Sequence, residues 1–376
     1  MNSGATTTHL ETSSSNFNEV VRFIRELNKR VENWRESRII LKSLGIPLST
    51  GPETTVEKLE TEFEKNTFNA SSISQSKMRK ILEEISLACN KSVFLYKVDG
   101  NWNKIKEKLF SDLVPNSIFS EKFPYLATGD ELRNIDFEPY FCGIIPNDGY
   151  TYFPFGTKRA FTQKTAINLN TLHADDREVL KKYSKVIGTE EIVEEFIDVL
   201  CINEEKQILE IRIDKGEHVS RKDLDEAHAA LRDMVLQHIT NIDKDATVKE
   251  INIFEIIKPL YNKDDEGRVC ELAFECYDDS LHTQHYRREK KDIRSQVFHT
   301  GGKSATGDID PFRMAVAWEI ADGEKNRELE VVFPGTRSAL RANIPFLGHF
   351  VIKKCLYKYD FNRIVEKLVD IKNEES

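Results

Sequence analysis

Apolar residues recur at two different periods along this chain, and the change of period limits the folds it can adopt. Near the N-terminus their spacing is three and four residues, which places them on one stripe of an α-helix because the helix turns every 3.6 residues. Further segments with this spacing predict a helical region over residues 16–90. A Ser- and Thr-rich segment before it predicts a disordered tail over 1–15. The stripe consists of Phe17, Val20, Ile24, Leu27, Val31 and Trp34.

This stripe leaves two interpretations open. It can pack against the rest of its own domain, which is the usual fate of an amphipathic helix. If the chain does not cover it, the 17–34 helix should bind a partner protein or a second copy, because exposed apolar stripes of that size are unusual in monomers.

After about residue 90 the apolar period falls to two, which is typical of strands with one buried face. Met314, Val316 and Trp318 alternate with smaller or polar residues, and an Asp322-Gly323 turn signal leads to a second alternating run. The fold class is therefore predicted to be α+β. We expect a helical N-terminal region followed by a mixed, largely antiparallel sheet with hairpins and flanking helices.

We expect an α+β domain over 91–260 and a basic, β-rich region over 261–376 that ends in a helix. Within these regions Glu190 to Glu195 has helical character, Ile251 to Ile257 is a strand, and Thr300 to Ser304 is a flexible basic loop.

The predicted order helix, strand, strand, helix over 189–240 is similar to the core of restriction-endonuclease-type nucleases. Such enzymes hold Mg²⁺ between carboxylates on two neighbouring strands, with a cation close by. Asp198 and Glu210 could be the metal ligands, and Arg212 stands where these nucleases have lysine. The alternative interpretation is a charged, solvent-exposed face of a hairpin.

Basic residues gather late in the chain, although its formal net charge is −9. If folding brings them together, they form a cationic surface that attracts phosphates. They could equally pair with the acidic majority of the same chain. The predicted nucleic-acid contacts are Arg287, Arg288, Lys290, Lys291, Arg294, Lys303, Arg337 and Arg341.

These observations predict a non-catalytic subunit that binds the nucleic-acid backbone or mediates assembly. Its setting would be a cytoplasmic multi-protein system, such as one that acts against foreign nucleic acid. The alternatives are the Mg²⁺-dependent nuclease and a pure protein-interaction subunit. Six dispersed cysteines suit the cytoplasm, and no apolar run is long enough for a membrane. We expect no metal site and no cofactor other than Mg²⁺ in the nuclease alternative.

Overall fold

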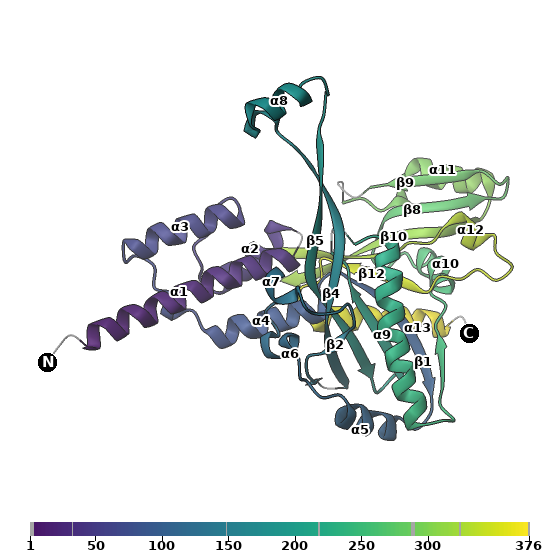
Figure 1. Cartoon of the computed structure of the whole chain (residues 1–376). Helices are drawn as coiled ribbons and strands as arrows, with labels where there is room; N and C mark the ends of the chain where they lie inside the picture. Colours follow the sequence, from purple (N-terminus) through teal and green to yellow (C-terminus); the bar gives the residue numbers. More distant parts are fainter. Residues whose placement is uncertain are drawn as a thin grey trace.

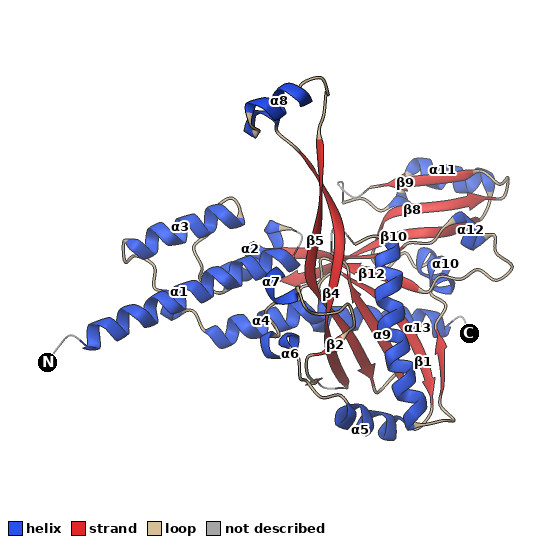
Figure 2. Ribbon diagram, viewed as in Figure 1, coloured by secondary structure: helices blue, strands red, loops and turns tan. Residues whose placement is uncertain are grey.

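The computed structural model describes residues 4–31, 33–147, 149–216, 219–286, 290–322 and 325–374. In this part of the chain, thirteen α-helices accompany one sheet of twelve strands, in which every described pair is antiparallel. Four of these helices precede the first strand and the other nine lie between or after the strands. The predicted α+β class, with a helical N-terminal region, is confirmed (Figure 2).

Four helices form the N-terminal region: α1 (Gly4–Arg30), α2 (Trp34–Ser43), α3 (Pro52–Glu64) and α4 (Gln75–Ala88). The apolar stripe of α1 is buried against α3, α4 and their neighbours, with Val20, Ile24 and Leu27 fully inaccessible. The chain itself therefore covers the stripe, which leaves it unavailable for the partner binding considered above.

The N-terminal helix differs from the expected one at both ends. It begins at Gly4, where the sequence suggested a disordered tail, because extending a formed helix costs less than nucleating one. It ends at Arg30, and Asn33 starts a separate helix by accepting a hydrogen bond from the Arg35 backbone N–H at 2.9 Å.

Strand β1 (Lys91–Asp99) lies at the centre of the sheet, whose order is β2-β4-β5-β6-β1-β12-β11-β10-β8-β9. It pairs with β6 (Ile208–Asp214) on one side and with β12 (His349–Lys353) on the other. Beyond β12 come β11 (Lys325–Phe333), β10 (Ile309–Asp322), β8 (Arg268–Cys276) and β9 (Leu281–His285). One sheet therefore contains strands from both sides of the domain boundary expected at residue 260, because β1 pairs with strands of both regions.

Two strands of the sheet, β4 (Tyr150–Ala166) and β5 (Ile187–Asn203), pair along their whole length and form an arm. Their inner halves are buried, whereas their outer halves leave the body and carry α8 (Ala174–Leu180) at the tip (Figure 1). Glu190 to Glu195, expected to be helical, belong to β5. Continuous pairing, which reaches Ala166 opposite Ile187, overrides their helical propensity.

Helices cover both faces of the sheet. On one face α5 (Trp102–Asp112) and α9 (Arg221–Ile242) pack over β1, β4, β5 and β6. On the other face, helices α10 (Phe254–Asn262) and α13 (Lys358–Glu374) pack over β1, β8, β10, β11 and β12. The remaining elements are short: α6 (Ile118–Lys122), α7 (Gly129–Leu132), α11 (Val297–Thr306), α12 (Arg337–Leu340), β2 (Tyr140–Phe141), β3 (Ile145–Asn147) and β7 (Thr247–Glu250).

Two further local predictions are wrong. The strand expected over 251–257 is not formed, because Asn252 accepts a hydrogen bond from the Phe254 N–H and α10 begins there. A short apolar run fits a buried strand and a buried helix equally well. The expected loop over 300–304 lies within α11, which ends at Thr306 and is capped by Gly307 with a φ of 86°.

Candidate nucleic-acid interface

The structure separates the predicted nuclease residues. In the β5–β6 register Cys201 lies opposite Glu210 and Val199 lies opposite Arg212, so these four side chains share one face of the sheet. Asp198 alternates with Val199 and therefore points to the other face. The two carboxylates do not share one metal site in this arrangement.

Asp198 is buried and fully engaged. Its carboxylate accepts hydrogen bonds from Thr157 Oγ1 and the Asp214 backbone N–H, both at 2.8 Å, and pairs with Arg159. The side chain therefore fastens β4, β5 and β6 to one another.

Glu210 and Arg212 form an ion pair in the core, with Arg212 Nη2 2.7 Å from Glu210 Oε2 and both side chains fully inaccessible. Burial raises the pKa of Glu210, and the adjacent guanidinium opposes that rise. Arg212 also donates to the Leu87 carbonyl at 3.2 Å and to Asn362 Oδ1 at 2.9 Å. The exposed charged face that we considered as the alternative is thus wrong for this pair.

The predicted basic residues do not all serve one surface. Arg287 and Arg288 lie outside the described residues. The Arg294 side chain is 7% exposed, pairs with Asp292 at 2.7 Å and donates to the backbone carbonyl of Gly267. Lys290 and Lys291 are exposed. Lys303 lies over the Tyr261 ring, 4.8 Å from its centroid.

Arg337 and Arg341 clamp one carboxylate, that of Glu275. Arg337 Nη2 is 3.1 Å from Glu275 Oε1, and Arg341 Nε is 3.1 Å from the same oxygen. Hydrogen bonds from Arg341 and Arg337 lower the pKa of Glu275 to about 2. Arg294 and this clamp lie near opposite ends of β8, separated by about 25 Å at the usual rise of a strand.

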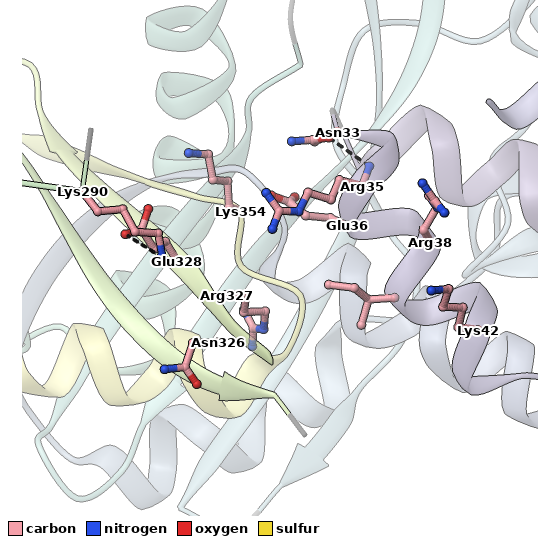
Figure 3. A pocket seen from close by; sticks show the side chains of 11 residues that line it. Asn33, Arg35, Glu36, Arg38, Lys42, Lys290, Asn326, Arg327, Glu328 and Lys354 are labelled. Atoms are coloured by element: carbon pink, nitrogen blue, oxygen red, sulfur yellow. Dashed lines mark hydrogen bonds and ion pairs between the residues drawn. The ribbon is translucent and has the colours of Figure 1, made fainter. Parts of the chain in front are cut away.

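A different set of cations surrounds a groove of about 520 Å³ between α2 and the sheet. We call it the basic groove, and Figure 3 shows it with α2 on one side and the sheet residues on the other. Its acidic lining residues are Glu36 and Glu328. Its basic lining residues are Arg35, Arg38, Lys42, Lys290, Arg327 and Lys354.

The α2 wall of the groove follows from the sequence of that helix. Arg35, Arg38 and Lys42 are spaced three and four apart, so they share one exposed face. The opposite face buries Ile40 and Leu41 in the N-terminal core. Within the described ranges none of the three cations forms an ion pair, and Glu36 is the one carboxylate of α2, so this wall keeps a net positive charge.

The sheet wall is partly neutralised. Lys290 Nζ lies 3.4 Å from Glu319 and 3.8 Å from Glu328, and Lys354 Nζ lies 3.5 Å from Glu330. Asn90 fixes the Lys354 backbone by accepting its N–H at 3.1 Å. Of the predicted contacts, Lys290 belongs to this groove. Arg35, Arg38 and Lys42 are not among the contacts predicted from the sequence, although their helical spacing could have identified them.

Comparison with known protein families found no matching family model. A search of curated proteins likewise found no significantly similar sequence. Among the described residues, no group of three or more His, Cys, Asp or Glu side chains is arranged to hold a metal ion. No helix in that part of the chain combines the length and apolar character that membrane crossing requires.

Proposed function

We propose that this protein is a non-catalytic nucleic-acid-binding protein that holds the phosphate backbone in the basic groove. The observation that carries this proposal is the stripe of Arg35, Arg38 and Lys42, which has no ion-pair partner in the described part of the chain and faces further cations across the groove. Of the contacts predicted from the sequence, Lys290 lines the groove, and Arg35, Arg38 and Lys42 stand in place of the others.

A polyanion suits this arrangement better than a single small anion. The stripe spans about 10 Å of helix axis, and duplex DNA carries one charge per ~1.7 Å, so several phosphates fall within its reach. Lys and Arg contacts to phosphates position a protein without reading bases. The multi-protein and defence setting predicted from the sequence depends on no residue of the groove and stays a prediction.

Neutralising the α2 stripe tests the proposal. The triple variant Arg35→Gln, Arg38→Gln, Lys42→Gln should bind labelled DNA and RNA at least about tenfold more weakly at low salt. Each phosphate contact releases counterions from the nucleic acid and so favours binding, and the variant lacks three such contacts. On duplex DNA the log–log salt slope should become shallower by about 2.7, at ~0.9 per contact. Fluorescence anisotropy over a salt series measures both quantities.

The matched control is Arg133→Gln, Arg221→Gln, Lys222→Gln, which removes the same charge from side chains that are 77%, 72% and 81% exposed elsewhere. It should bind like the natural protein, apart from a small general effect of net charge. Equal weakening in both triple variants would contradict a specific role for the groove, and unchanged binding in the α2 variant would refute the proposal.

A further inference from the structure

A second cavity, of about 460 Å³, lies where the arm meets the N-terminal helices. We call it the arm-base pocket. Its walls come from the end of α1 (Asn28, Lys29), the inner arm (Phe161, Glu195) and Asn90 at the start of β1. Segments far apart in the sequence therefore converge on one cavity, as is common for ligand sites.

Glu195 is the unusual group in this pocket. Its side chain is only 4% exposed. Oε2 accepts the backbone N–H of Ala127, but Oε1 has no hydrogen-bond partner among the described residues. Leaving a buried carboxylate oxygen unpaired is costly, so a ligand that donates a hydrogen bond here would be strongly favoured.

Glu194 and Lys215 also line the pocket, and two other charged neighbours of Glu195 are already paired. Arg30 pairs with Glu26 at 3.0 Å, and Asp214 pairs with Lys91 at 3.4 Å. The lining residue Phe161 contributes an aromatic ring, which packs edge-on against Phe196 with the ring centroids 6.4 Å apart, and Lys29 is an exposed cation. The pocket thus combines an acceptor, an apolar aromatic wall and a cation at its rim.

The arm-base pocket adjoins the basic groove. Asn90, which lines the pocket, accepts the backbone N–H of Lys354, which lines the groove. The α1 end of the pocket and the α2 start of the groove also flank the same helix break, between Arg30 and Asn33. A nucleic-acid strand bound in the groove therefore lies beside the pocket.

We propose that the arm-base pocket receives one unpaired base with an exocyclic amino group, cytosine or adenine, from a single strand bound in the basic groove. This inference rests on the proposed function. Carboxylates accept hydrogen bonds from such amino groups, as Glu and Asp do with cytosine N4. Unpaired bases also stack on aromatic side chains, here Phe161. Lys29 at the rim meets the phosphate of the same nucleotide.

Glu195→Gln gives a sharp test because it reverses the polarity at one atom. The Ala127 N–H still needs an acceptor, so the amide oxygen of Gln must face it, and the amide NH₂ then replaces Oε1. A donor in that place suits the keto oxygen of thymine or uracil. The matched control is Glu191→Gln, which makes the same charge change at an exposed arm residue outside the pocket.

The experiment compares equally long oligo-dC and oligo-dT, and oligo-rC and oligo-rU, by anisotropy at about pH 8, where the Glu195 carboxyl is mostly ionised. The natural protein and Glu191→Gln should prefer the C strands by about tenfold. Glu195→Gln should lose or invert that preference. Circular dichroism confirms that each variant is folded.

The outcomes separate this inference from the proposed function. If the natural protein binds C and T strands equally, or Glu195→Gln keeps the preference for C, the base pocket is refuted and backbone binding stands. If no strand binds at low salt, both proposals fail. The preference of the natural protein needs no variant, so a folding defect in Glu195→Gln cannot leave the inference untested.

Discussion

Replacing Arg212 with methionine is expected to lower the free energy of unfolding by about 3–5 kcal/mol, because it leaves the carboxylate of Glu210 buried without its cation. Both side chains are fully inaccessible, and Glu210 Oε1 already lacks a hydrogen-bond partner among the described residues. The guanidinium also stacks over Phe361, 4.1 Å from the ring centroid, and bonds to α4 and α13. Its loss therefore loosens the contact between β6 and two helices. Urea denaturation followed by circular dichroism measures the change.

The double variant Glu210→Leu, Arg212→Met distinguishes lost charge pairing from lost packing. Removing both charges should recover most of the stability, because a well-packed apolar pair can replace a buried ion pair at little cost. A double variant as unstable as Arg212→Met would show that packing around the guanidinium, rather than the unpaired carboxylate, dominates the loss.

The sequence predicted those elements whose signals are local. The hairpin of β10 and β11 follows from strict alternation around a turn, and α9 follows from an N-cap serine before an apolar helical stripe. The burial of Glu210 and Arg212 could not be predicted from such local signals. Charged residues at alternate strand positions usually face solvent. Here α4 and α13, about 125 and 150 residues away, cover them, and no local pattern reveals that cover.

Only one wall of the basic groove can be predicted from the sequence. The stripe of Arg35, Arg38 and Lys42 can be identified from helical spacing alone. The opposing wall depends on β1, which pairs with β12 and so brings Lys354 beside the N-terminal helices. Linear charge density instead pointed to Arg294, Arg337 and Arg341. In the folded chain nearby carboxylates pair with these three arginines. The density of basic residues along a sequence does not show which acidic residues will lie beside them.

The buried carboxyl of Glu195 should make the stability of this protein unusually sensitive to pH. Burial raises its pKa from 4.5 to about 7, and the Ala127 N–H and Arg30 only partly oppose that rise. Other charged groups around it are Glu26, Lys29, Lys122, Glu194, Asp214 and Lys215. Well below pH 4.5 the carboxyl is protonated in the folded and the unfolded chain, so its titration has no effect on stability there. As pH rises towards 7 the unfolded chain loses this proton first, so the folded state is progressively destabilised.

Glu195→Gln removes this titration and should therefore stabilise the protein at alkaline pH. Relative to the natural protein, its free energy of unfolding should rise by about 2–3 kcal/mol between pH 5 and pH 8, since one pKa unit corresponds to ~1.4 kcal/mol. Urea denaturation of both proteins across this range measures the difference, in which the titration of all other groups cancels to first order. Glu191→Gln, which makes the same charge change at an exposed position of the same strand, is the control. Parallel stability curves for Glu195→Gln and the natural protein would mean that this carboxyl titrates normally and that its burial is relieved in solution.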